Sequence, residues 1–328
     1  MAKHAYVAYK LTVTKARQAD TLLNLGDLEA TGIDFLALFH GFLSDVQAKP
    51  IKDERFGRYL DIESISPRGR CIRFITQYGR YGTTGRLIDT TTGDTTHDYD
   101  EDESAVSPTR NLLASPESGD SAVFLAERYG GRGAASMILG QFKRAFKQRF
   151  EDDNLIFNYE GLLDQAAWDK YVQNADMTAI EVTRHGASSD FADGSVAKAV
   201  GKIVCAVKPR WGERRFPRTV RDRVLSSEVK AQEVIGLKAQ DDDEVELVLN
   251  DGVQQKRLLV GQPGVPVLVY PVADDNADRP TDDEVYAAMR QKVSELRTSI
   301  GLKLPYAWEA GEWGRQQLGV ALAAVRDG

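Results

Sequence analysis

Three short β-rich runs between residues 56 and 93 constrain the fold more than any other feature of the sequence. The runs are FGRYLDIESI, GRCIRFITQY and TGRLIDTTTG, and the turn segments SPRG and GRYGT lie between them. Strands this close in sequence, joined by glycine-containing turns, pair most simply as antiparallel neighbours. The sequence therefore predicts a meander in a sheet of antiparallel or mixed pairing.

Three amphipathic segments predict helices that pack on such a sheet. Apolar residues recur at intervals of three or four after Asp34, between Ile138 and Phe150, and between Val285 and Ile300. This is the spacing of one helix face. Thr281 with Glu284 has the spacing of a capping box before the third helix. That long helix is expected to pack either on its own sheet or against a partner subunit.

Further runs complete an α+β fold. AYVAYKLTV predicts a first strand, and DEVELVLNDGVQQKRLLVG predicts a hairpin with an Asn-Asp-Gly turn. Residues 94–118 are polar and acidic, which favours a loop or a weak strand. LGVALAAV predicts a terminal helix, preceded by Trp308 and Trp313 as anchors in the core or an interface.

The length of 328 residues suits two lobes better than one small core. The polar segment HGASSDFADGS is a plausible boundary. We expect an N-terminal α+β domain at 1–190 and a C-terminal α+β domain at 191–328, which carries a basic patch, the hairpin and the long helix. Each lobe is expected to hold a mixed or antiparallel sheet with packed helices.

Cellular location follows from what the sequence lacks. No apolar run approaches the ~18–20 residues of a membrane-spanning helix, and the N-terminus lacks the apolar core of a signal peptide. Cys71 and Cys205 lie in separate strand-like runs, which suits two buried thiols in a reducing compartment. The protein is expected to be cytoplasmic.

Signatures of catalysis and cofactor binding are missing as well. Four histidines and two separated cysteines give no zinc spacing. The acidic cluster at 98–103 lacks the glycine and distal glutamate of a calcium loop. The turn at 131–136 is a degenerate dinucleotide fingerprint without alternating strands and helices around it, although a bare anion site at that helix N-terminus stays open. We predict no enzyme, no cofactor, no metal and no small-molecule substrate.

The segment from Lys202 to Arg223 is strongly basic in an otherwise acidic chain. It holds eight basic and two acidic residues, a net charge of +6, whereas the whole protein has a net charge of −7. Such segregation of charge indicates a polyanionic partner. The basic residues are Lys202, Lys208, Arg210, Arg214, Arg215, Arg218, Arg221 and Arg223.

Nucleic-acid phosphate is the expected partner of this segment. No recognition helix with a base-reading pattern is evident, so we predict binding to double-stranded DNA without sequence preference. Six phosphate contacts would give a slope near −5 in log affinity against log salt. Trp211 and Phe216 either contact the nucleic acid or anchor the segment in the core. A second basic face on a helix, formed by Lys143, Arg144 and Lys147, is included among the DNA-binding candidates.

Two alternatives remain open for the basic segment. Asp222 with the Glu228-Val229-Lys230 run could hold a magnesium ion beside a phosphate, as in a metal-dependent nuclease effector. The segment could instead dock the acidic face of another protein.

Four stretches together resemble a known family. The AYVAYK strand, the meander at 59–63 and 72–76, the SAVFLAERYGG strand with its helix, and AVKPRW before basic residues resemble the RexA-type phage-exclusion sensors of temperate phages. The closing hairpin followed by TDDEVYAAMRQKVSEL also fits. The acidic segment 94–118 and the Trp-containing tail depart from that pattern.

The resemblance implies a two-lobed α+β homodimer that binds DNA and acts with a membrane-protein effector. The corresponding function is that of a sequence-nonspecific DNA-binding sensor in antiviral defence, which aborts infection by signalling to the membrane. The mode of effector contact is open because of the two departures.

Overall fold

A large antiparallel sheet is the framework of the molecule. The computed structural model describes residues 4–28, 32–129, 132–162, 175–185, 202–210, 212–225, 236, 244–250, 255–260, 266–272 and 279–326. Within these residues, thirteen strands form one sheet and every pairing is antiparallel. The main path runs through β12 (Lys202–Val207), β11 (Asp176–His185), β13 (Glu244–Asn250), β14 (Gln255–Val260), β15 (Pro266–Pro271), β1 (His4–Lys15), β9 (Ala122–Tyr129), β8 (Ser107–Ala114), β5 (Cys71–Arg80), β4 (Arg58–Arg68) and β3 (Ile51–Asp53). The predicted α+β class is confirmed.

Strand β1 joins the two halves of this sheet. Along one edge, Ala5 to Val7 pair with β15, and the residues from Tyr9 onward pair with β10 (Leu155–Gly161). Its other edge pairs with β9 and, at Thr14 and Lys15, with β2 (Gln18–Leu22), where the register shifts between these two residues. β1 is nearly buried throughout, as expected for a strand covered on both faces.

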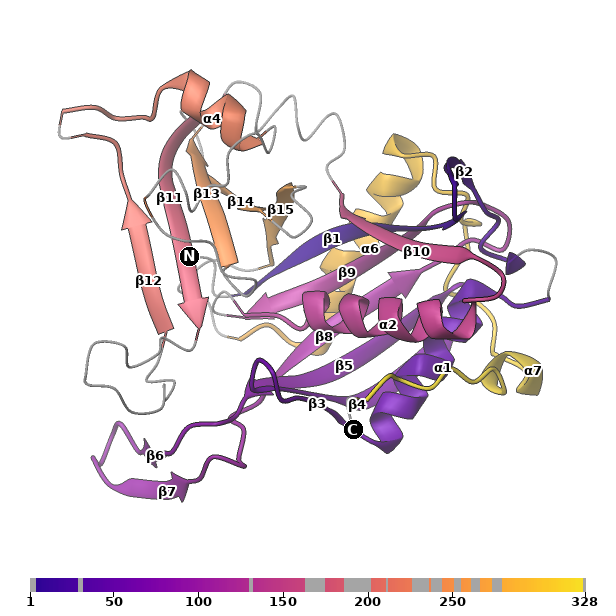
Figure 1. Cartoon of the computed structure of the whole chain (residues 1–328), viewed down its shortest axis with the longest axis horizontal. Helices are drawn as coiled ribbons and strands as arrows, with labels where there is room; N and C mark the ends of the chain where they lie inside the picture. The colour runs from indigo at the N-terminus through magenta and orange to yellow at the C-terminus, as the bar shows by residue number, and fades with distance from the viewer. Residues whose placement is uncertain are drawn as a thin grey trace.

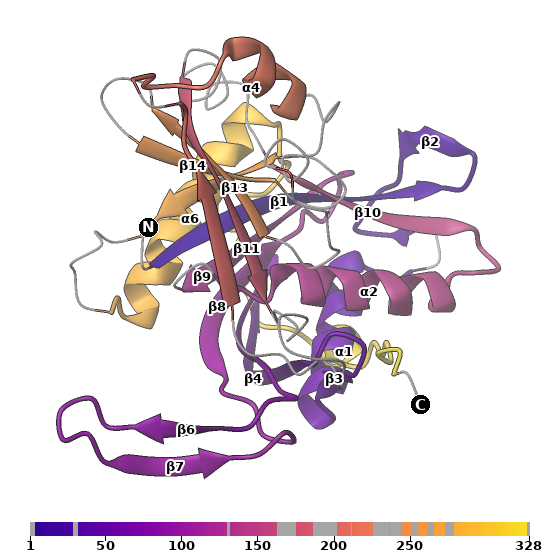
Figure 2. The same ribbon diagram turned by 60° about the vertical axis from the view of Figure 1, so that its left-hand side comes forward.

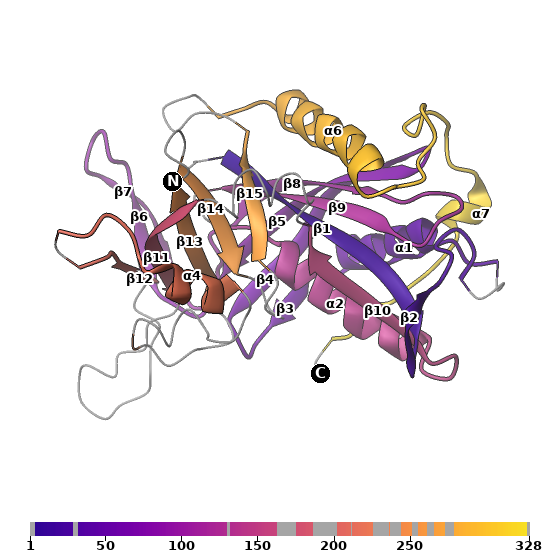
Figure 3. The ribbon, with the colours of Figure 1, turned by 90° about the horizontal axis from the view of Figure 1, so that it is seen from above.

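Helices cover both faces of the sheet around β1. α1 (Phe35–Ala48) and α2 (Ala135–Arg149) lie on one face, and α6 (Asp282–Ser299) lies on the other (Figure 1 and Figure 3). Alternate residues of β1 pack on the two faces of the sheet, because successive side chains of a strand point to opposite faces. Val7, Tyr9 and Leu11 face α1 and α2, whereas Tyr6 and Ala8 face α6.

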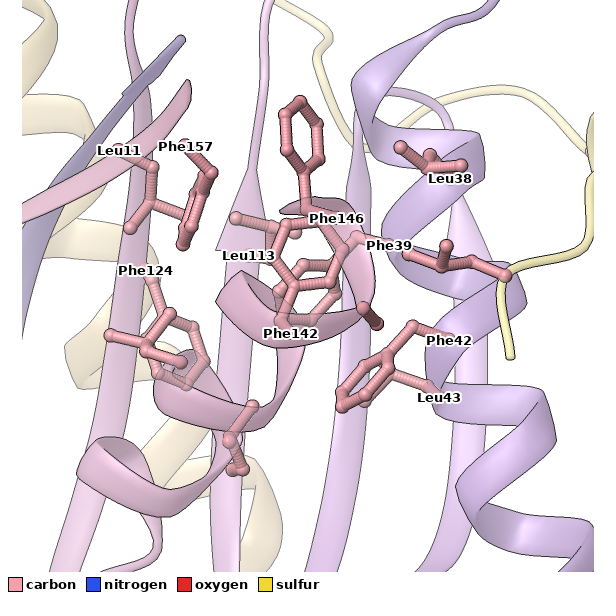
Figure 4. Close-up of a cluster of buried hydrophobic side chains, with 14 of the residues drawn as sticks. Leu11, Leu38, Phe39, Phe42, Leu43, Leu113, Phe124, Phe142, Phe146 and Phe157 are labelled. Atoms are coloured by element: carbon pink, nitrogen blue, oxygen red, sulfur yellow. The ribbon is translucent and has the colours of Figure 1, made fainter. Parts of the chain in front are cut away.

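The core between α1, α2 and the sheet is mainly phenylalanine. Phe142 lies at its centre, with its ring centroid 4.6 Å from that of Phe39 and 4.8 Å from that of Phe157 (Figure 4). The predicted stripe of α2 is buried as expected, from Ile138 to Phe150. The α1 stripe is likewise buried, and the Asp34 carboxylate caps the first turn by accepting from two backbone N–H groups.

Helix α6 packs on its own sheet. Val285, Met289, Val293 and Leu296 are fully buried against β1, β8 and β9, so the apolar stripe is occupied within the chain and is not free for a partner subunit. The predicted capping box at Thr281 and Glu284 is present, and Gly301, with φ +68, follows the last turn.

The predicted meander holds for two of its three strands. β4 and β5 pair along their whole length, but the third run becomes β6 (Gly85–Ile88), which pairs only with β7 (Thr95–Tyr99) in a separate two-stranded sheet. The place beside β5 is taken by β8. Residues 94–118 are therefore not simply a loop or weak strand, because they contain a central strand that is buried from Thr109 to Ala114.

The C-terminal tail corrects another prediction. After the short α7 (Arg315–Leu318), residues 319–326 are not helical, so the predicted LGVALAAV helix is wrong. Instead Leu322 and Ala324 pack into the core in an extended segment across α1. A side chain at Gly41 would lie 2.3 Å from the Val320 carbonyl oxygen, so glycine lets the tail approach the helix. Trp308 is buried, as predicted for a core anchor, and the Trp313 indole donates to the Gly69 carbonyl at 2.9 Å.

The division at residue 190 stays a prediction. Elements from both sides of it share the sheet, since β11 pairs with β13 and β15 pairs with β1. The boundary loop and the segment DQAAWDKYVQ lie outside the described residues. Cys71 is buried, and burial raises the pKa of its thiol to about 12, whereas Cys205 is only partly buried. No helix among the described residues is long and apolar enough to cross a membrane.

Candidate nucleic-acid interface

The basic segment leaves the sheet at one end and returns to it as a helix. β12 pairs with β11 and leads to a turn in which Glu213 N–H donates to the Arg210 carbonyl at 2.8 Å. Gly212 takes φ +92 there, a conformation that glycine adopts without a steric cost. α4 (Arg218–Leu225) follows directly after Pro217 and packs over β11 (Figure 1). The predicted strand, turn and helix are confirmed.

Phe216 anchors this segment in the core. Its side chain is half-buried against the apolar cluster under α4, and its backbone N–H donates to the Met177 carbonyl at 2.8 Å. This is the structural role considered for the aromatic residues. Trp211 lies outside the described residues.

Two arginines of the segment have partners on the sheet or beside it. Arg215 donates two hydrogen bonds of 2.9 Å to the two carboxylate oxygens of Asp176. Arg221 is only 8% exposed, and its guanidinium donates to the Ala175 carbonyl at 2.6 Å and to Asp222 at 2.7 Å and 2.9 Å. The Arg221 guanidinium is thus turned inward, toward the sheet.

Four other basic residues of the segment are exposed. In the part of the chain that the structure describes, none of their side chains makes an ion pair. They are Lys208, Arg210, Arg214 and Arg218. Arg223 is also exposed, in the last turn of α4. Lys202 pairs through its backbone with His185 at the start of β12.

The second basic group lies on a different helix. Lys143, Arg144 and Lys147 are exposed on α2, off its buried stripe, as predicted. The Lys143 Nζ lies 5.8 Å from the centroid of the Tyr159 ring. α2 and α4 cover different parts of the sheet (Figure 1 and Figure 2), so the two basic groups do not form one continuous patch.

A buried ionic cluster was not anticipated from the sequence. Glu127 is fully buried on β9, where it accepts from the Arg110 guanidinium at 3.0 Å and contacts His4 Nδ1 at 3.2 Å. Arg110 also donates to Asp282 in the first turn of α6. The cluster therefore links three strands to α6, and the signal for it was a glutamate within the apolar run AVFLAERY. Among the residues that the structure describes, none is a hydrogen-bond partner of His4 Nε2.

The residues considered for metal chemistry lie apart or outside the described part of the chain. Among the described residues, no three His, Cys, Asp or Glu side chains are grouped to hold a metal ion. Asp222 accepts from Arg221, and the Glu228-Val229-Lys230 run lies outside the described residues. The nuclease alternative stays a prediction.

Comparison with known proteins gives no relative for this chain. No protein-family model matches it, and no curated protein or solved structure matches it significantly. The resemblance to RexA-type sensors therefore remains a prediction from the motifs in the sequence.

Proposed function

We propose that this protein binds double-stranded DNA without sequence preference through the segment from Lys208 to Arg223. The observation that carries the proposal is the set of four exposed cations, Lys208, Arg210, Arg214 and Arg218, without an ion-pair partner among the described residues. Phosphates release condensed counterions when such cations neutralise them, which makes polyanion binding favourable at low salt.

The neighbouring contacts support this role by fixing the segment. Arg215 is held by Asp176, Arg221 by the Ala175 carbonyl, and Phe216 by the apolar cluster below. A cation on a segment that is already ordered loses less conformational entropy on binding than one on a free loop. α4 is short, and the four exposed cations lie partly before it and partly at its start, so the expected contacts are to the phosphate backbone.

The biological setting that we propose rests on the sequence resemblance. In that setting a cytoplasmic homodimer senses phage infection through DNA and signals to a membrane-protein effector, which aborts the infection. An adjacent gene for a small membrane protein would support this setting, and DNA binding can be tested without it.

Salt dependence is the sharpest test of DNA binding. Six contacts predict a slope near −5, but the structure turns Arg221 inward and pairs Arg215 with Asp176. Four contacts instead give a slope of about −3.6 in log affinity against log salt on duplexes of unrelated sequence. A slope near zero, or no binding to any duplex at low salt, would refute the proposal.

Matched variants identify which basic group binds. Substituting Arg210, Arg214 and Arg218 with glutamine should reduce the slope to about −0.9. Glutamine substitutions of Lys143, Arg144 and Lys147 remove an equal charge from α2. This variant is the matched control for the loss of charge. If only the α2 variant weakens binding, the interface lies on α2 and our assignment to the 208–223 segment is wrong.

A further inference from the structure

An acidic β-ribbon projects from the body of the molecule. Residues 82–104 form it, with β6 and β7 as its two strands, and both stand clear of the main sheet (Figure 1 and Figure 2). Its tip side chains include Leu87 and Ile88, which are 48% and 51% exposed. An isolated two-stranded hairpin is marginally stable in water, so a contact that covers the ribbon would stabilise it.

The charge of the ribbon limits what can cover it. Residues 82–104 hold seven acidic residues and one arginine, a net charge of −6. The acidic residues are Asp89, Asp94, Asp98, Asp100, Glu101, Asp102 and Glu103. A β-ribbon can enter a DNA groove, but seven carboxylates would be repelled by phosphates. The ribbon therefore fits a basic protein surface.

One basic surface of matching size is present in the same chain. The segment from Lys202 to Arg223 has a net charge of +6. Figure 1 and Figure 2 both show the ribbon at one end of the molecule and α4 at the opposite end, with β11 and β12 between them. The ribbon therefore lies away from α4 and the turn before it in its own chain, whereas a second copy can offer that part of the basic segment.

We propose that the acidic ribbon of each protomer docks on the basic segment of a second copy. A two-fold axis makes this contact twice, because each copy supplies one ribbon and one basic segment. Stable interfaces use about 20–30 residues on each side, and residues 82–104 together with 208–223 hold 39 residues, which is enough for an interface of that size. The exposed apolar side chains of the ribbon would be covered in the same contact.

This contact would also regulate the proposed DNA site. Arg210, Arg214 and Arg218 are used in both, so the ribbon and phosphate would compete for the same cations. The competition rests on the proposed function, whereas the ribbon contact itself does not.

Charge exchange between the two surfaces tests the contact by sedimentation velocity, which reports the oligomeric state. The ribbon variant carries Asp94→Lys, Asp98→Lys and Asp102→Lys. The segment variant carries Arg210→Glu, Arg214→Glu and Arg218→Glu. A control with the same charge change as the ribbon variant carries Glu151→Lys, Asp152→Lys and Asp153→Lys in the exposed turn after α2.

The wild-type protein should dimerise at about 50 mM salt and dissociate at about 500 mM, because exposed charges are screened there. The ribbon and segment variants should each weaken the dimer about tenfold or more, since like charges then face each other. A variant that combines all six substitutions should dimerise again, and the control should have the same dimer affinity as the wild type. A monomeric wild type, or a dimer that both variants leave unchanged, would overturn the proposal.

DNA titrations on the same samples separate this proposal from the proposed function. If the protein binds DNA and neither charge variant changes the dimer affinity, only the proposed ribbon contact is wrong. If no DNA binds and the dimer follows the charge exchange, the ribbon contact stands and the DNA function fails. With both correct, the ribbon variant should bind DNA more tightly than the control of equal net charge.

Discussion

Alanine substitutions of Arg221 and Arg218, made separately, should show that Arg221 stabilises the fold and that Arg218 contributes to DNA binding. Arg221 is 8% exposed and donates to the Ala175 carbonyl at 2.6 Å, and Ala175 is itself 1% exposed. Removing the guanidinium leaves that carbonyl without this donor, and an unsatisfied buried group costs about 1–3 kcal/mol. The lost packing of the side-chain stem adds to this. Arg218 is exposed at the start of α4, where a substitution changes stability by about 0.5 kcal/mol or less.

Urea denaturation followed by fluorescence measures the first effect, and DNA titration over a salt series measures the second. We expect Arg221→Ala to be destabilised by about 1–3 kcal/mol with an unchanged salt slope in its folded state. Arg218→Ala should keep its stability and lose about 0.9 of slope. An Arg221→Ala protein with wild-type stability and weaker DNA binding would show that this arginine faces the ligand, and the structural reasoning would be wrong.

Three further predictions concern the rest of the fold. Phe142→Ala should destabilise the protein by about 3–5 kcal/mol in urea, because the ring is fully buried among other phenylalanines, whereas Phe142→Leu should cost clearly less. Burial lowers the pKa of His40, so the unfolded chain takes up a proton more readily than the folded protein does. The free energy of unfolding should therefore fall as the pH drops below about 6.5, by at most about 1.4 kcal/mol per pH unit. A His40→Gln variant should lose that part of the pH dependence, and a variant with the wild-type pH profile would contradict this prediction. Thr281→Ala removes the cap of α6 and should cost about 1 kcal/mol, while Thr281→Ser should be close to neutral.

Local patterns in the sequence were sufficient for most elements of the fold. The stripes of α1, α2 and α6 are visible because a helix on a sheet needs one continuous apolar face. Thr281 with Glu284 placed the start of α6, because a capping box also depends on residues close in sequence. These features depend on residues a few positions apart, so they can be recognised without the rest of the chain.

The errors fall where distant residues decide the structure. β8 carries Pro108 and Arg110 and has a short apolar run, so its sequence alone is that of a weak strand. It becomes a central strand because β5 and β9 flank it and because Glu127 neutralises Arg110. The tail from Gly319 has helix-forming residues, yet packing of Leu322 on α1 and the hydrogen bond from Ala324 N–H to Asp45 at 2.9 Å favour the extended form.

The basic segment shows the same limit for charge. A count along the sequence treats its eight cations alike, but the partner of Arg215 is 39 positions away and the acceptor of Arg221 is 46 positions away. Those contacts hold the segment against β11, and they leave Lys208, Arg210, Arg214 and Arg218 on its outer side. The internal arginines thus determine where the exposed ones are presented. Because the exposed cations follow a turn and a short helix, their arrangement suits a continuous polyanion, either a phosphate backbone or the acidic ribbon of a second copy.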